Sequence, residues 1–304
     1  MSLDLIEPLS IDSWNPVLDT AAQSAAIDTA AQDAAIDALE AGKVLYLPRL
    51  RFDVQAAERR FLSTQWSDGK SKNIYLRGRE RVLRGTVGSA EDQAALAAMI
   101  ERFGSNAQSL VSALFPCYVP HLQFGNTSFR PFEIEGRPPK SFRKDDTRLH
   151  SDAFPSNPTA GARLLRVFTN VNAQGRPRVW RVGEPFGDMA ARILPRARRQ
   201  WPGEAALLHA LHVTKKRRSQ FDHFMLELHD RTKADLDYQR DMPQQRVEFP
   251  PGSTWIVFSD QVLHAVLSGA MMMEQTWMLP VAALRHPERA PLRVLESMVG
   301  RALI

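Results

Sequence analysis

The sequence predicts an α+β protein with a double-stranded β-helix core, the jelly-roll or cupin-like fold, and flanking helices. Short apolar segments from Leu122 onward are interrupted by proline and glycine, which is typical of a β-sandwich or jelly roll. Apolar residues at helical spacing occur before these segments, and a helical insert rich in Arg, Lys, His and Leu lies between them. His150, Asp152 and His264 lie on strand-like segments and can meet at one metal ion.

The chain has 304 residues and is 44% hydrophobic, enough to bury a large core. We expect one domain over 1–304, with helical support over about 1–115. The jelly-roll core is expected over about 116–285, with a helical insert over about 186–235. No apolar stretch is long enough for a membrane span and no signal peptide is evident, so a cytoplasmic location is expected.

Each predicted element rests on a local pattern. Ala21 to Ala41 is rich in good helix formers, and 91–115 carries apolar residues at helical spacing. KVLYLPRL (43–50) is an apolar run ended by proline, which predicts a buried strand. Further strands are predicted at LQFGNTSFR (122–130), DTRLHSDAF (146–154), ARLLRVFTNVN (162–172), PRVWRVG (177–183), STWIVF (253–258), VLHAVLSG (262–269) and AMMMEQTWMLPV (270–281).

A two-histidine, one-carboxylate metal site is the main functional prediction. His150 and Asp152 are two residues apart in an extended segment, so their side chains share one face, and His264 supplies a second imidazole. Such a set with open positions suits Fe(II) and O2 better than structural zinc. The single cysteine, Cys117, excludes a thiolate cluster. The triplet alone is also compatible with a histidine beside a turn aspartate and no metal.

Candidate cosubstrate residues follow from strand periodicity. Period two places Arg166 and Asn170 on one face of 162–172 and Arg163 on the other. A buried arginine needs an anionic partner, and the far carboxylate of a dicarboxylate cosubstrate would fit. Trp180 can wall the pocket or pack in the core.

The last strand adds a prediction that depends on a turn. If Ser268-Gly269 forms a two-residue hairpin loop, Gln275 shares the face of His264, whereas Glu274 and Thr276 point away. A three- or five-residue loop would reverse this arrangement.

The net charge is +5, and basic residues cluster in 70–85 and 136–148. These clusters are either solvated surface or contacts for an anionic substrate. The candidate contacts are Lys72, Arg81, Arg84, Arg143 and Lys144, and the first run also contains Lys70, Arg77 and Arg79. Nucleic acid is not expected, because aromatic residues are not interleaved with these runs.

The passages DDTRLHSDAFPSNPTAG, LRVFTNVNAQGRPRVWRVGEPF and SDQVLHAVLSG with EQTW resemble the Kdo hydroxylase family. These are bacterial Fe(II)- and 2-oxoglutarate-dependent dioxygenases that act on 3-deoxy-D-manno-oct-2-ulosonic acid (Kdo) of lipopolysaccharide. The resemblance implies that His150, Asp152 and His264 bind Fe(II), with 2-oxoglutarate and O2 as cosubstrates. Relatives in the wider superfamily carry Arg or Lys on the last strand as a cosubstrate anchor. Here Met273 to Thr276 occupy that place, so the anchor is expected at Arg166, with Arg163, Arg130 and Gln275 as alternatives.

The resemblance also implies a substrate and a place of action. The expected substrate is Kdo-containing lipid A, hydroxylated at C3 of Kdo to give D-glycero-D-talo-oct-2-ulosonic acid. The basic chain is then expected to contact the cytoplasmic face of the inner membrane peripherally. Two alternatives stay open: a 2-oxoglutarate oxygenase of another small molecule or protein side chain, and a non-catalytic jelly-roll module that binds anionic sugars.

Overall fold

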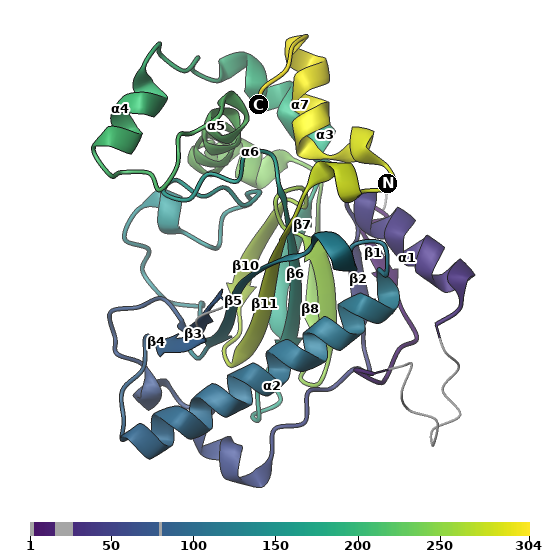
Figure 1. Ribbon diagram of the computed structural model, residues 1–304, viewed down its shortest axis with the longest axis vertical. Helices are drawn as coiled ribbons and strands as arrows, with labels where there is room; N and C mark the ends of the chain where they lie inside the picture. The colour runs from purple at the N-terminus through teal and green to yellow at the C-terminus, as the bar shows by residue number, and fades with distance from the viewer. Residues whose placement is uncertain (1–2, 16–26, 79–80) are drawn as a thin grey trace.

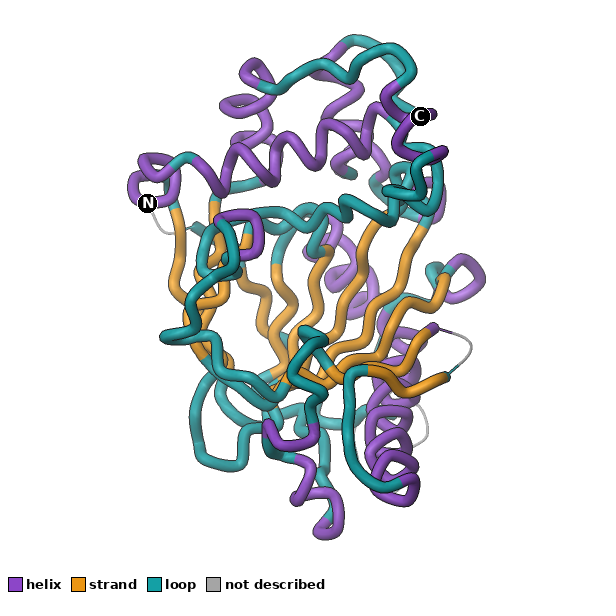
Figure 2. The backbone as a smooth tube through the Cα atoms, turned by 90° about the vertical axis from the view of Figure 1, so that its left-hand side faces the viewer, coloured by secondary structure: helices purple, strands orange, loops and turns teal. Residues whose placement is uncertain are grey.

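Two facing β-sheets form the core of the computed structural model, which describes residues 3–15, 27–78 and 81–304 (Figure 1). Within these ranges the larger sheet has eight strands, in spatial order β1 (Ile6–Pro8), β2 (Val44–Leu47), β9 (Thr254–Phe258), β6 (Arg163–Asn170), β11 (Met272–Leu279), β5 (Gln123–Arg130), β3 (Ile74–Arg77) and β4 (Val82–Arg84). The smaller sheet contains β10 (His264–Ser268), β7 (Arg178–Gly183) and β8 (Gln244–Phe249). Figure 2 shows the strands of the larger sheet side by side in a curved layer. The predicted α+β class with a jelly-roll core is confirmed.

The two faces of the larger sheet have different neighbours. On β6, Leu164, Arg166 and Phe168 point between the sheets, while Leu165 and Val167 join the apolar cluster on the outer face. This alternation follows from the two-residue period of a strand. Side chains of the first set can therefore reach a site between the sheets, and those of the second set cannot.

Helix α2 (Ala90–Leu114) covers the outer face of the larger sheet, with α1 (Thr29–Glu40) beside it (Figure 1). Ser89 caps α2 by accepting a hydrogen bond from the Asp92 backbone N–H at 3.1 Å. Between the sheets, aromatic rings dominate, and Phe249 stacks on Trp255 with 4.1 Å between ring centroids. Each sheet face therefore has its own apolar core.

The remaining helices gather at one end of the two sheets (Figure 1). Between β7 and β8 the chain forms α3 (Phe186–Ile193), α4 (Glu204–Ala210), α5 (Gln220–Ala234) and α6 (Leu236–Asp241). The C-terminal helix α7 (Pro291–Val299) packs against α3. Helices thus lie where the sequence predicts an insert, and they continue to Asp241.

Three expectations need correction. The segment 146–154 forms no strand and has only an isolated bridge between His150 and His264. The polar strand β8 was not predicted, because its residues lack an apolar alternation. The region before residue 115 contributes β1, β3 and β4 in addition to the helices and β2, the strand predicted within 43–50. Helix α1 begins at Thr29, and residues 21–26 of the expected helix lie outside the described ranges.

The buried carboxylate of Glu40, the last residue of α1, forms hydrogen bonds with two segments that are distant in the sequence. Glu40 is fully buried and accepts hydrogen bonds from the Tyr118 hydroxyl at 2.5 Å and the His286 backbone N–H at 2.6 Å. The Arg285 backbone N–H donates to the same carboxylate at 2.9 Å. Burial, together with the Glu40 contact, raises the pKa of Tyr118, so the hydroxyl stays protonated and keeps donating.

Glu40→Ala is expected to lower the free energy of unfolding by about 3 kcal/mol, because it leaves a buried hydroxyl and two backbone donors without their acceptor. Urea unfolding measures the change. Exposed Glu288→Ala is the control and should have little effect. Equal stabilities of the two variants would contradict this account.

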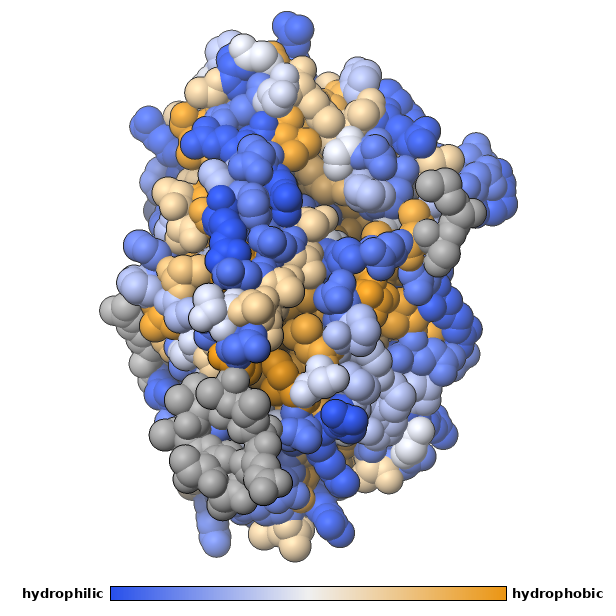
Figure 3. Space-filling view, turned by 90° about the vertical axis from the view of Figure 1, so that its right-hand side faces the viewer, coloured by the Kyte–Doolittle hydropathy of each residue, from blue (hydrophilic) through white to orange (hydrophobic). Residues whose placement is uncertain are grey.

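Hydrophilic residues cover most of the face that carries α1 (Figure 3). No helix in the described ranges has both the length and the hydropathy that a membrane span requires.

Candidate metal centre

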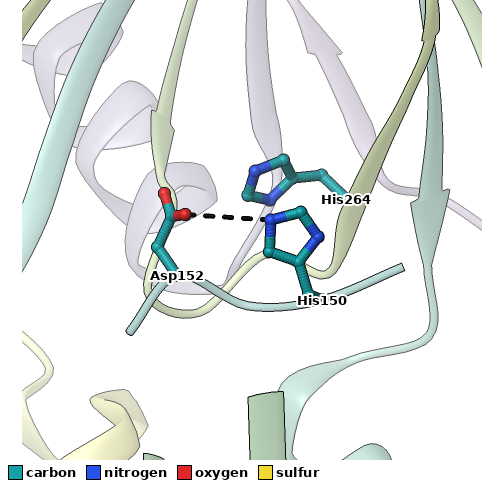
Figure 4. Close-up of side chains that lie close together, drawn as sticks. All are labelled: His150, Asp152 and His264. Atoms are coloured by element: carbon teal, nitrogen blue, oxygen red, sulfur yellow. Dashed lines mark ion pairs between the residues drawn. The ribbon is translucent and has the colours of Figure 1, made fainter. Parts of the chain in front are cut away.

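Two imidazoles and one carboxylate converge at the end of the space between the sheets (Figure 4). His150, Asp152 and His264 each offer a ligand atom, and these atoms lie within 4.8 Å of one another. His150 Nε2 is 3.9 Å from Asp152 Oδ1. Separations of this size allow all three atoms to bind a single metal ion.

Backbone carbonyls fix the orientation of both imidazoles. His150 Nδ1 is 2.7 Å from the Arg148 carbonyl, and His264 Nδ1 is 2.9 Å from the Val262 carbonyl. A proton on each Nδ1 donates to these oxygens, which leaves each Nε2 with a free lone pair. Burial lowers the pKa of both histidines, so they are neutral near pH 7 and able to bind metal.

Arg166 keeps the third ligand ionised. Burial by itself would raise the pKa of Asp152, but the positive Arg166 guanidinium and His264 outweigh burial, and the pKa lies below its usual range. Arg166 Nη1 is 3.1 Å from Asp152 Oδ2, an oxygen that accepts no hydrogen bond. A divalent cation would give this buried carboxylate a second positive partner beside Arg166. The donor set therefore fits a hard or borderline metal such as Fe(II).

The segment that carries His150 is held from both sides. His150 and His264 exchange two backbone hydrogen bonds of 3.1 and 2.9 Å. On the other side, the Gln239 side chain accepts from the Leu149 N–H at 2.7 Å and donates to the Leu149 carbonyl at 3.0 Å. The side chain of Gln239 on α6 thus makes the two hydrogen bonds to the Leu149 backbone that a neighbouring strand would otherwise make.

Helix α5 adds further support. The His229 ring packs edge-on against His150, with 5.3 Å between centroids. The buried Lys233 Nζ donates to the Arg143 carbonyl at 3.0 Å, and Arg148 Nη1 donates to the Lys233 carbonyl at 2.7 Å. The helical insert therefore positions the metal-ligand segment, a role that no local sequence pattern indicates.

Gln239→Ala is expected to weaken Fe(II) binding about tenfold, because loss of groups that orient ligands typically costs 10–100-fold in metal affinity. Anaerobic titration with Fe(II) gives the dissociation constant. Gln93→Ala, on α2, serves as the control and should leave it unchanged. An unaltered constant in the Gln239 variant would show that the insert does not position His150.

A cavity of about 800 Å³ opens from the three ligands. Its lining in the described residues includes six cationic side chains and three carboxylates: Lys72, Arg77, Arg130, Arg166, Arg178, Lys215, Asp146, Asp152 and Glu274. With a divalent ion bound, the cavity carries a strong positive charge and favours anionic ligands.

Arg178 is a deeply buried cation of this cavity. It is 2% exposed, donates to the Gly269 carbonyl, and has no ion pair with any described carboxylate. Burial, with the nearby charge of Arg130, lowers the pKa of Arg178 to about 9. Its buried Nε has no hydrogen-bond partner. An anionic group bound here would stabilise the charged guanidinium. In the predicted strand 177–183, the two-residue period places Arg178 and Trp180 on the same face, and this pattern indicates from the sequence that Arg178 can line the pocket.

The prediction that Gln275 faces the metal is wrong. Strands β10 and β11 belong to different sheets and form no hairpin, so Glu274 and Thr276 line the cavity instead. Gln275 lies on the outer face, where its amide oxygen accepts from the Thr127 hydroxyl. Glu274 forms ion pairs with Arg166 and Arg130.

The other predicted cosubstrate residues divide into two groups. Arg130, Arg166 and Trp180 line the cavity, and Trp180 stacks on His264 with 5.0 Å between centroids. Arg163 faces the other side and binds Asp260 at 2.7 Å. Asn170 donates to the Phe249 carbonyl at 2.9 Å and does not line the cavity. Arg163 and Asn170 are thus structural in this arrangement.

Of the predicted substrate contacts, only Lys72 lines the cavity, where its Nζ is 2.7 Å from Asp146. Arg81 pairs with Glu101 of α2 and Arg143 pairs with Asp230 of α5. Arg84 and Lys144 are exposed away from the lining. Arg77 also reaches the cavity, whereas Arg79 lies outside the described residues. Lys215 also lines the cavity and was not predicted as a contact, although it lies in the basic run Lys215 to Arg218.

A histidine, aspartate and histidine cluster between two jelly-roll sheets is the site of a mononuclear non-haem metal oxygenase. The model of the family "3-deoxy-D-manno-oct-2-ulosonic acid (Kdo) hydroxylase" matches residues 22–302. This chain therefore belongs to the Kdo hydroxylase family.

Solved structures agree with this assignment. The Kdo hydroxylase KdoO, described as a non-haem Fe(II) α-ketoglutarate-dependent dioxygenase, is similar in its complex with α-ketoglutarate and Fe(III). That structure has 45% identity and a TM-score of 0.92, with 98% of this chain and 97% of the other covered. The KdoO complex with cobalt(II) has 46% identity and a TM-score of 0.93, with 99% and 97% covered. No curated protein sequence matches significantly.

Proposed function

We propose that this protein is an Fe(II)- and 2-oxoglutarate-dependent dioxygenase that hydroxylates C3 of Kdo in Kdo-containing lipid A. The product is D-glycero-D-talo-oct-2-ulosonic acid. The observation that carries the proposal is the metal-ligand cluster at the end of a cation-lined cavity, in a member of the Kdo hydroxylase family. When bound, Fe(II) and 2-oxoglutarate supply the activation of O2 for attack on a C–H bond.

The protein's own residues would bind and orient the reactants. His150, Asp152 and His264 hold the metal on one side, and Arg166 keeps Asp152 ionised. Arg166 already forms ion pairs with Asp152 and Glu274. The proposed anchor for the far carboxylate of 2-oxoglutarate is therefore Arg178, with Arg130 near it. Trp180 forms an apolar wall beside His264.

The outer part of the cavity would bind the sugar acid. Lys72, Arg77 and Lys215 line the cavity, and each can bind the Kdo carboxylate or a nearby phosphate. We place the enzyme at the cytoplasmic face of the inner membrane, in peripheral contact with it, because a lipid-linked substrate requires access to the bilayer surface.

Succinate release from 2-oxoglutarate by anaerobically iron-loaded protein, started with O2, tests this function. Lipid A with Kdo should stimulate succinate release and gain the mass of one oxygen atom, whereas lipid A without Kdo should do neither. Slow succinate release at the same rate with and without Kdo would support the oxygenase activity but would contradict Kdo as the substrate. If the protein neither released succinate nor bound iron, the result would favour the alternative of a non-catalytic module that binds anionic sugars.

A further inference from the structure

We propose that residues on and around α4 form a surface that binds an anionic phospholipid bilayer. The surface, here called the α4 surface, consists of Trp201, Leu207, Leu211, Val213, Lys216 and Arg217. It lies at the outer edge of the molecule, where α4 stands apart on long connections (Figure 1). The substrate-lipid part of the argument rests on the proposed function, but binding to the bilayer does not.

Large apolar side chains are concentrated here. Trp201 is 69% exposed, Leu211 64%, Leu207 59% and Val213 50%. Leu207 lies on α4 and Leu211, four residues later, caps its C-terminus, so the two leucines follow one another on the same side of this segment. A single exposed leucine is ordinary, but four large exposed apolar side chains in one short segment, one of them a tryptophan, indicate an interaction site. Tryptophan is also the residue favoured at the water–bilayer interface.

Cations flank these apolar residues. The run Lys215 to Arg218 follows directly, and Glu204 is the only acidic residue in 198–218. Two hydrogen bonds of 2.8 Å connect Glu204 to Arg198, which neutralises that carboxylate. Lys216 and Arg217 are exposed and form no ion pair with the described residues. An anionic surface provides the complementary charge, and apolar side chains inserted between its headgroups add to binding.

The structure holds this segment in place. The Lys215 N–H donates to the Ser156 carbonyl at 3.0 Å, and Arg218 Nη2 donates to the Pro155 carbonyl at 2.8 Å. His223 Nε2 contacts the Arg198 carbonyl at 2.7 Å. The apolar side chains therefore stay exposed on an anchored segment, and Thr214 is the buried residue that separates Val213 from the basic run.

The α4 surface adjoins the cavity that contains the metal-ligand cluster. Lys215 lines this cavity, as do Pro155 and Ser156, the residues that anchor the segment. A bilayer bound at the α4 surface would therefore face the cavity entrance. The sugar end of a membrane lipid could then enter the cavity while its acyl chains remain in the bilayer.

Co-sedimentation of the full-length protein with vesicles tests the proposal. Vesicles of phosphatidylethanolamine and phosphatidylglycerol should sediment the protein, and phosphatidylcholine vesicles should not. Leu207→Ser with Leu211→Ser, and separately Lys216→Glu with Arg217→Glu, should each reduce partitioning about tenfold. Added salt should weaken binding of the wild type and the serine variant, but have little further effect on the charge-reversed variant.

Two control variants carry the same kinds of substitution at exposed positions outside the α4 surface. Val119→Ser with Met298→Ser removes exposed apolar side chains, and Arg59→Glu with Arg301→Glu makes the same change in net charge. Both should bind vesicles like the wild type. Binding that is equal in all variants, or absent from the wild type, would overturn the proposal, as would binding carried by an associated protein or nucleic acid.

These vesicles contain no Kdo, so the result is independent of the catalytic proposal. In parallel, succinate release with a water-soluble Kdo glycoside should be the same in the α4-surface variants and the wild type. Loss of turnover on the soluble sugar would indicate a damaged active site and would count against a separate docking surface. Thermal unfolding verifies that each variant is folded.

Discussion

His264→Ala is expected to abolish Kdo hydroxylation, with succinate release reduced at least about a thousandfold, since it removes one of three metal ligands. Metal analysis after anaerobic dialysis should show loss of bound Fe(II). The backbone hydrogen bonds between residues 150 and 264 do not depend on the side chain. The variant should therefore remain folded, although it loses the stacking of His264 on Trp180.

His286→Ala is the matched control, because His286 is a partly exposed histidine that pairs with Asp37. It should retain Fe(II) and activity. A His264 variant that turned over at the wild-type rate would refute the assignment of this metal centre.

Arg178→Gln is expected to weaken 2-oxoglutarate binding by about ten- to a hundredfold, the effect of losing a charge-assisted hydrogen bond of about 1.5–3 kcal/mol. Calorimetric titration of the metal-loaded protein measures the dissociation constant directly. Steady-state kinetics should show a raised KM for 2-oxoglutarate and a smaller change in kcat. Arg178→Lys should recover part of the affinity, because the lysine restores the charge but not the planar guanidinium.

Arg163→Gln distinguishes this effect from general damage. Arg163 is as deeply buried as Arg178, but it faces the other side of the larger sheet and pairs with Asp260. Its replacement should lower the melting temperature and leave 2-oxoglutarate affinity unchanged. If both variants bound 2-oxoglutarate like the wild type, Arg178 would not be the anchor.

Local sequence patterns predicted most of the strands and the three residues of the metal cluster. Period two and β-branched residues identify β6 and β9, and the two-residue spacing of His150 and Asp152 lets both side chains reach one metal ion. These features depend only on residues that are close together in the chain, so they can be predicted from the sequence before the fold is known.

The errors concern pairings between distant segments. Gln275 was assigned to the wrong face because the sequence of the Ser268-Gly269 turn does not reveal that the chain passes from one sheet to the other. The conformation of the His150 segment likewise depends on Gln239, which lies far along the chain. The partners of Arg166 and Arg178 depend on how charges from several strands meet, and periodicity carries no information about that.

The pairing of His150 with His264 has a consequence for the order of folding. The two backbone hydrogen bonds between them close a very long loop, and contacts of this kind form late, because chain entropy opposes them until nearer contacts have formed. We therefore expect the three ligands to be assembled only in a nearly complete fold. A nascent or partly unfolded chain lacks the complete site and has less opportunity to capture Cu(II) or Zn(II), which bind such ligands more tightly than Fe(II) does.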